Sequence, residues 1–187
     1  MRCLDPSAED GERATVCTFC ELTALLDRAG LTAAGFLVWM PELSQAELNN
    51  AVRALYVARD AKDSPLVKMA NRTLEVLTTR RAEAKKRLGT DDPLLLATAL
   101  HEQLDDTAYA ARIEKLEGIR FLPLDRYLVP QRSGRDVNVF PRMMAYWTSP
   151  EGPYGKVPVS EWEALFKSVR EKAAAEVSQE PVAEATS

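Results

Sequence analysis

Apolar residues recur at helical spacing through the first two thirds of the chain. Their spacing predicts a short helix over residues 18–29, with Gly30 as its left-handed stop. Thr32 is expected to begin a second apolar turn that runs to Trp39. Leu22, Leu25 and Leu26 form one stripe on the first helix, and Pro41 ends the second turn.

Stronger start signals predict longer helices further along. Ser44 and Glu47 form a capping box, in which each side chain accepts a hydrogen bond from a free backbone N–H. Prolines that follow a serine or an aspartate give two more starts, and an Asp-Asp-Thr run gives another. Short polar connections between such helices imply antiparallel neighbours packed as a bundle. The predicted helices cover residues 44–61, 65–88, 94–104 and 105–117.

The pattern changes after Gly118. Residues 119–129 are rich in β-forming side chains, and apolar residues alternate along 137–147. A polar, glycine-containing turn separates these segments, so we predict a β-hairpin whose prolines confine its strands to edges or bulges. A loop rich in proline and glycine follows. The last helix carries one apolar face, formed by Trp162, Leu165, Phe166, Val169 and Ala173.

Together these elements predict an α+β fold that is predominantly α. It is a helical bundle with a β-hairpin insertion and an amphipathic C-terminal helix. We expect a flexible arm over residues 1–15, the helical bundle over 16–118, the hairpin and Pro/Gly-rich loop over 119–158, the C-terminal helix over 159–176 and a disordered tail over 177–187.

Composition supports a globular protein. The 187 residues are 46% apolar and 28% charged, with a formal net charge of −4. This charge hides blocks of opposite sign, because residues 65–89 hold seven basic and two acidic side chains, whereas residues 90–118 hold two basic and seven acidic ones. Residues 119–158 are again basic, with six cations against three anions. Such blocks either pair with one another or steer a charged partner.

The compartment is predicted from what the sequence lacks. The first residues are acidic where a signal peptide needs a basic start and an apolar run. The longest apolar run, over residues 33–40, is far shorter than a bilayer-spanning helix. Three cysteines are an odd number, which argues against a disulfide framework. We therefore expect a cytoplasmic protein with no membrane partner.

A basic cluster ends the predicted 65–88 helix. Cations there complement the helix dipole, and this explains several of them without a ligand. As a nucleic-acid contact, the same cluster would neutralise phosphates. The acidity of the whole chain argues against a dedicated DNA-binding protein. The cluster consists of Arg80, Arg81, Lys85, Lys86 and Arg87.

The hairpin and the loop after it interleave arginines with aromatic residues. This composition suits single-stranded nucleic acid, whose bases stack on aromatic rings. It equally suits the anchors of a protein interface, and some of the aromatics are expected to pack in the core. We favour the protein interface. The predicted partner-binding residues are Arg132, Arg135, Phe140, Arg142, Tyr146, Trp147 and Tyr154.

Metal and catalytic chemistry find little support. Cys3, Cys17, Cys20 and His101 are the one zinc-ligand set that the chain offers, but their spacing lacks two compact ligand pairs. We interpret the cysteines as small core residues and expect no bound metal. The sequence has no phosphate-binding loop, dinucleotide-binding glycines or nucleophile elbow. We therefore expect no cofactor and no enzymatic activity.

These observations lead to two functional hypotheses. The first is a non-enzymatic protein-interaction module, an assembly component or regulator that binds a protein partner through the hairpin and loop. A homo-oligomer is one form of this hypothesis. The alternative is a nucleic-acid-binding regulator that uses the basic helix end and the hairpin arginines.

Overall fold

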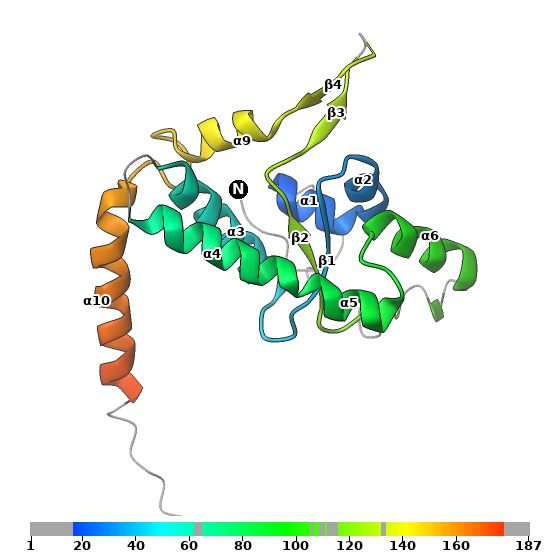
Figure 1. The fold of residues 1–187 in the computed structure, drawn as a ribbon, viewed down its shortest axis with the longest axis horizontal. Coiled ribbons are helices and arrows are strands. Elements are labelled where there is room, and N and C mark those ends of the chain that lie inside the picture. Colours follow the sequence, from blue (N-terminus) through cyan, green and yellow to red (C-terminus); the bar gives the residue numbers. More distant parts are fainter. Residues whose placement is uncertain are drawn as a thin grey trace, which may run out of the picture.

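The computed structural model describes residues 17–61, 65–105, 107–108, 111, 116–131 and 134–177. These residues are mostly helical and include two small antiparallel sheets, as Figure 1 shows. The prediction of a predominantly α member of the α+β class is confirmed.

The helices differ widely in length. They are α1 (Thr18–Ala24), α2 (Leu26–Leu31), α3 (Gln45–Asp60), α4 (Leu66–Thr79), α5 (Arg81–Leu88), α6 (Pro93–Gln103), α9 (Phe140–Trp147) and α10 (Val159–Val177). The strands are β1 (Gly35–Trp39), β2 (Ile119–Pro123), β3 (Leu128–Pro130) and β4 (Asp136–Asn138).

Two of the predicted helix starts are confirmed by their caps, whereas Pro65 is the N-cap of α4 and not its first helical residue. The Ser44 hydroxyl accepts from the Glu47 N–H at 3.2 Å, and the Glu47 carboxylate accepts from the Ser44 N–H at 2.7 Å. At the start of α6, the Asp92 carboxylate accepts from the Leu94 N–H at 2.8 Å. Gly89 ends α5 with φ of 78°, a left-handed conformation that glycine adopts without strain.

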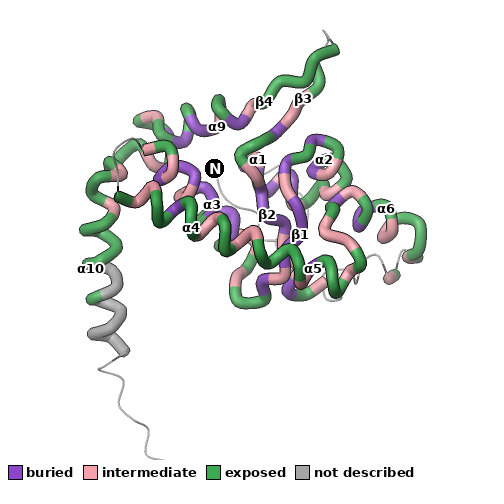
Figure 2. Tube along the Cα trace, in the orientation of Figure 1, coloured by how far each residue is buried: buried purple, intermediate pink, exposed green. Residues whose placement is uncertain are grey.

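The centre of the molecule is the sheet of β1 and β2. The strands are antiparallel, with Phe36 opposite Leu122 and Leu37 opposite Phe121. Because side chains alternate across a strand, each face of the sheet receives its own layer of helices. Figure 2 shows that the buried residues gather around this sheet.

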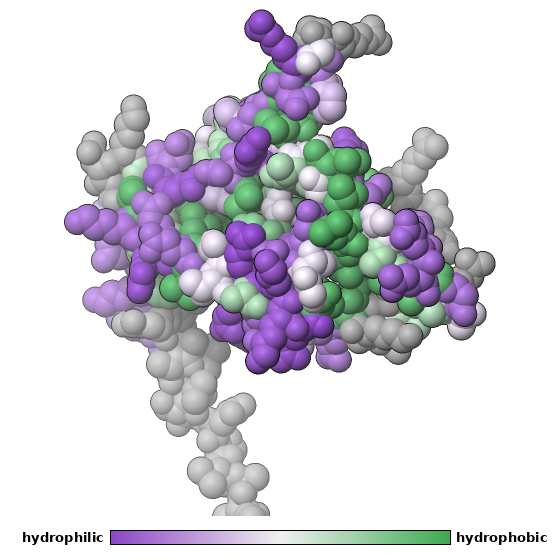
Figure 3. Space-filling model, turned by 45° about the vertical axis from the view of Figure 1, so that its right-hand side comes forward, coloured by the Kyte–Doolittle hydropathy of each residue, from purple (hydrophilic) through white to green (hydrophobic). Residues whose placement is uncertain are grey.

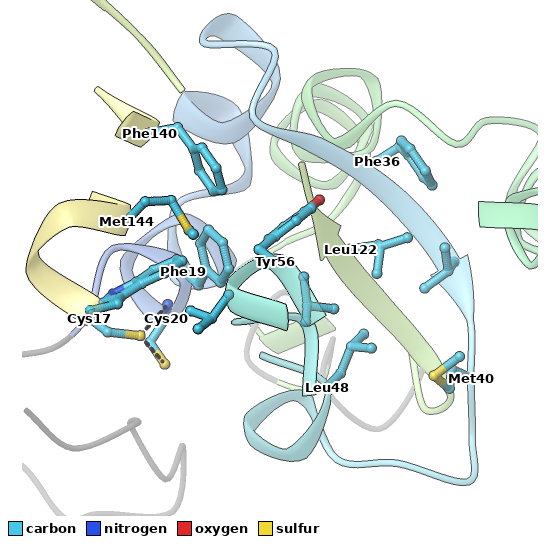
Figure 4. Close-up of a cluster of buried hydrophobic side chains, with 14 residues drawn as sticks. Cys17, Phe19, Cys20, Phe36, Met40, Leu48, Tyr56, Leu122, Phe140 and Met144 are labelled. Carbon is cyan, nitrogen blue, oxygen red and sulfur yellow. Dashed lines mark hydrogen bonds between the residues drawn. The ribbon is translucent and has the colours of Figure 1, made fainter. Parts of the chain in front are cut away.

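One face of the sheet packs on α3. Phe36 and Leu122 lie in one cluster with Leu48 and Tyr56 of α3, as Figure 4 shows. The opposite face carries Leu37, which packs against helices α5 and α6 through Ala84 and Leu96. Phe121, on that same face, packs against Leu22 and Ala29. The two strands therefore connect helices that lie far apart in the sequence.

The outer edge of β1 bonds to the chain around α5. The Trp39 N–H donates to the Arg80 carbonyl at 3.2 Å, and the Leu37 N–H donates to the Asp91 carbonyl at 2.8 Å. Arg80 lies at the junction where α4 ends and α5 begins. The helix predicted over residues 65–88 is thus two helices, α4 and α5. The Arg80 carbonyl at their junction accepts a hydrogen bond from strand β1.

The outer edge of β2 is satisfied by one side chain. The Gln45 amide donates to the Phe121 carbonyl at 2.8 Å and accepts from the Phe121 N–H at 2.8 Å. This reciprocal pair replaces the hydrogen bonds of a third strand. The Tyr56 hydroxyl donates to the neighbouring Pro123 carbonyl at 2.9 Å. Helix α3 therefore closes this edge of the sheet as well as covering one face.

The second apolar turn predicted from Thr32 to Trp39 is wrong, because residues 35–39 form strand β1. The segment is buried on both faces, so its apolar residues run without alternation and resemble a buried helix. The neighbouring prediction also fails at Gly30, which lies inside α2 rather than after it. A Cβ at Gly30 would lie 2.4 Å from the Leu94 Cβ, so this glycine allows α2 to pack closely on α6.

The strand predicted over residues 137–147 is also wrong beyond its first two residues, because α9 begins at Phe140 with Pro141 in its first turn. The buried residues of this segment are Phe140, Met144 and Trp147, whose spacing is that of one helix face and not the alternation of a strand. Residues 119–123 pair with β1 rather than with this segment.

A shorter hairpin forms between these segments. Strand β3 pairs with β4 around Val129 and Val137, and the turn between them contains Gly134 with φ of 76°. The predicted hairpin is thus present, but shorter than expected. The predicted helix over 105–117 falls largely outside the described residues, as does the tail predicted over 177–187, and the arm predicted over 1–15 lies wholly outside them.

Removing the Gln45 amide should destabilise the fold. Gln45→Ala leaves the N–H and C=O of Phe121 without their partner beside the core, and we expect the free energy of unfolding to fall by about 2 kcal/mol. Gln103→Ala removes an exposed amide at the end of α6 and serves as the matched control. Urea unfolding measures both variants. Equal stability of the two would contradict a role for Gln45 in closing the sheet.

Candidate functional site

The β3–β4 hairpin projects from the body of the molecule, as Figure 1 shows. Its base is held by Asn138, whose side-chain oxygen accepts from the Tyr127 N–H at 3.0 Å and from the Phe140 N–H at 3.1 Å. The inner side of β3 is also tied to the body, since the Leu128 N–H donates to the Thr32 carbonyl at 3.3 Å. All three residues of β4 are exposed.

Strand β4 presents its backbone to the outside. The Val139 N–H donates to the Tyr127 carbonyl, and the Gln131 N–H donates to the Arg135 carbonyl. Because hydrogen-bonded pairs alternate along an antiparallel ladder, the backbone groups of Asp136 and Asn138 face away from β3. In the described part of the chain, no further strand pairs with this edge. Val137, in the same strand, is 46% exposed.

The predicted partner-binding residues divide into two groups. Phe140 and Trp147 are buried and meet edge to face, with ring centroids 5.9 Å apart. Tyr154 is half-buried and packs on Trp162. Arg135, Arg142 and Tyr146 are exposed. Phe140, Trp147 and Tyr154 therefore pack within the fold, whereas Arg135, Arg142 and Tyr146 are exposed and open to a partner. Arg132 lies outside the described residues.

A polar pocket of about 340 Å³ lies at the C-terminal end of α9. Arg53 of α3 forms one wall, and Tyr146 and Trp147 of α9 form another. The loop after α9 closes it with Glu151, Gly152, Pro153 and Lys156. Arg53 is 8% exposed, and its guanidinium donates to the Asn50 side-chain oxygen. The pocket thus joins a buried cation to an exposed lysine beside two aromatic rings.

Sequence reasoning did not select Arg53 as a functional residue. Its position in the sequence could have indicated its burial. Arg53 directly follows the core residue Val52 and lies three residues before the core residue Tyr56, so it is a cation beside the apolar stripe of α3. Lys156 is one of the six cations over residues 119–158, and no sequence pattern distinguishes it from the others.

A larger pocket of about 450 Å³ lies between α3, α4 and the chain after β2. Its charged groups already have partners within the chain, since the Arg59 guanidinium lies 2.8 Å from the Asp125 carboxylate and Glu75 lies 3.3 Å from Arg72. The Tyr56 hydroxyl, which also lines it, donates to Pro123. This pocket is therefore explained by contacts within the fold.

Most cations of the basic cluster at α5 already form ion pairs with acidic residues of the same chain. Arg80 pairs with Glu42 at 2.7 Å, Arg81 with Asp91 at 2.5 Å and Arg87 with Glu83 at 2.9 Å. Two of these guanidinium groups also stack on aromatic rings, Arg81 on Phe36 and Arg87 on Trp39. Lys85 and Lys86 are exposed and form no ion pair with a described residue.

Cys17 and Cys20 lie in the core at the start of α1. The Cys17 thiol donates to the Cys20 sulfur at 3.2 Å and caps the helix by accepting from the Cys20 N–H. His101 is exposed on α6, and Cys3 lies outside the described residues. Among the residues that the structure describes, no three cysteine, histidine or acidic side chains gather closely enough to hold a metal.

The hydrogen bond to Cys20, together with burial, raises the pKa of the Cys17 thiol well above its ordinary value of 9.0. A thiol in this environment stays protonated at neutral pH, and it is the thiolate that attacks electrophiles and binds zinc. The interpretation of Cys17 as a small core residue therefore has a physical basis.

Hydrophobic residues also reach the surface outside the pocket. Figure 3 shows a band of them among hydrophilic neighbours. The most exposed large apolar side chains on α2, α6 and α10 are Leu31, Leu95, Leu165 and Phe166. In the described part of the chain, no helix has the length and apolar character needed to cross a bilayer.

Comparison with protein-family models found no match. Comparison with curated proteins found none either. The function is therefore inferred from the geometry of the chain itself.

The Cys17 thiol should make stability depend on alkaline pH. The folded state holds this proton more tightly than the unfolded state does, so the free energy of unfolding falls as the pH rises above about 9. Cys17→Ser removes this titration and keeps a side chain that caps α1. We expect the native chain to lose about 1 kcal/mol more than the variant by about pH 10.

Urea unfolding at a series of pH values measures this difference. Burial also raises the pKa of Tyr56, but that group titrates at higher pH and is present in both proteins. Parallel curves for the native chain and the Cys17→Ser variant would contradict the assignment.

Proposed function

We propose that the protein is a non-enzymatic protein-interaction module, an assembly component or regulator. It binds a protein partner through the β3–β4 hairpin and the adjoining α9 and loop. We also propose that it acts in the cytoplasm, as the sequence predicts. The observation that carries the interaction proposal is the open edge of β4.

Physical reasoning favours a partner at this edge. A two-stranded hairpin is at best marginally stable in water without packing on its face or pairing along its side. An exposed strand edge is a template for another chain, and proteins otherwise protect such edges. Addition of a strand from a partner is a known mode of peptide recognition. The hairpin is the part of the fold that this mode fits best.

The surface beside the hairpin suits the same role. Arg142 and Tyr146 lie one helical turn apart on α9, so they share a face. Arginine and tyrosine are common anchors of protein interfaces. Tyr146 is 43% exposed and retains ring area for a partner. The α5 cluster offers less to nucleic acid, because three of its five cations already pair with acids of the same chain.

Two substitutions of Asp136 test whether the open edge of β4 binds the partner. Asp136→Pro removes the outward N–H of β4 and leaves the ladder to β3 intact, whereas Asp136→Ala removes the same carboxylate and keeps the N–H. With the tagged full chain as bait in extracts of the native host, we expect a specific partner to be captured by the alanine variant. Its recovery by the proline variant should fall about tenfold.

Thermal unfolding checks that both variants fold alike. Light scattering on the same proteins tests whether the partner is a second copy of the chain. A partner recovered equally by both variants, or no specific partner and a strict monomer, would contradict the proposal.

A further inference from the structure

The pocket at the end of α9 has the chemistry of a carboxylate site. Two cations, Arg53 and Lys156, line it against one carboxylate, Glu151, so its charge is net positive. Neither Lys156 nor Glu151 forms an ion pair with a described residue, although both belong to the same pocket. The pocket therefore contains cationic groups whose positions are compatible with an incoming anion.

Arg53 forms a largely buried part of the pocket lining. The side chain is fixed by burial and by its hydrogen bond to Asn50. A guanidinium presents parallel N–H groups that match the two oxygens of a carboxylate. Because Arg53 is buried, its charge is poorly screened by water, and an ion pair formed there is stronger than one at the surface. Lys156 adds a second, exposed positive charge at the rim.

The surroundings favour an extended ligand over an isolated anion. Tyr146 lines the pocket and is also exposed, and Arg142 lies one helical turn before it on the same face. A chain that leaves the pocket along α9 therefore meets an aromatic ring and then another cation. Successive acidic residues in one peptide would satisfy both ends of this path.

We propose that the pocket of Arg53 and Lys156 binds a carboxylate side chain from an acidic peptide segment, with Arg142 contacting the same segment along α9. The inference rests on the proposed interaction function and names the chemistry of its partner. The hairpin edge supplies backbone pairing, and the pocket supplies the preference for acidic side chains.

A charge-reversal pair tests the pocket. The probe is a fluorescein-labelled hexaglutamate peptide, with hexaglutamine as the neutral peptide, added to the full chain at low salt. Lys156→Glu should weaken hexaglutamate binding about tenfold. Lys68→Glu changes the net charge equally at an exposed position of α4 outside the pocket, and it should weaken binding less than about twofold.

A second variant and a direct signal complete the test. Arg53→Lys keeps the charge and loses the paired N–H groups, so it should weaken binding about threefold while retaining cooperative unfolding. In an NMR titration, the Trp147 indole N–H signal should shift with hexaglutamate more than with an equal charge of inorganic phosphate. No binding, equal loss in the Lys156 and Lys68 variants, or equal shifts with phosphate would overturn the proposal.

The two proposals can fail separately. A partner captured in a manner that depends on the Asp136 N–H, but equally well by Lys156→Glu, would overturn the acidic-segment inference and leave the interaction function standing. Pocket-dependent hexaglutamate binding without any partner at the hairpin would overturn the interaction function instead.

Discussion

The fold depends on closing both outer edges of the two-stranded β1–β2 sheet. Every second backbone N–H and C=O of such a sheet points away from its partner strand, and leaving these groups unpaired beside a core is costly. Here the Gln45 side chain serves Phe121 on one edge, and the Arg80 and Asp91 carbonyls serve β1 on the other. These contacts place α3 and α5 on opposite edges of the sheet. The core residues on either face then follow from strand alternation.

The two sheets of the molecule differ in this respect. In β1–β2 the edge groups are satisfied within the chain, and the strands are buried. In β3–β4 one strand is anchored to the body at Thr32, while the edge of β4 faces outward. The same physical requirement that explains the centre of the fold thus makes the hairpin the best candidate for binding. Helix α9 links the hairpin to the pocket of Arg53 and Lys156, so all the proposed contacts except Arg53 of α3 lie along one connected segment.

Helix starts could be predicted from the sequence because they depend on local chemistry. Ser44 with Glu47, and Asp92 with Pro93, act through atoms a few residues away. Strand β1 could not be predicted from the sequence, because its apolar residues do not alternate with polar ones and its partners in β2 lie far along the chain. Alternation misled at 137–147, where the apolar Val137 and Val139 precede a helix that buries Phe140, Met144 and Trp147. The sequence predicted the region of the candidate site but not its individual residues. Sequence does not show that Trp147 is buried while Tyr146 is exposed, or that folding brings Arg53 of α3 to the pocket.

Native-state hydrogen exchange tests the role of edge closure most directly. The amides of Leu37, Trp39 and Phe121 donate outward from the central sheet to Asp91, Arg80 and Gln45. If these bonds belong to the cooperative core, the three amides should exchange only when the whole protein unfolds, while the outward Asp136 amide exchanges from the folded state. Exchange of the three at the rate of Asp136 would contradict the account.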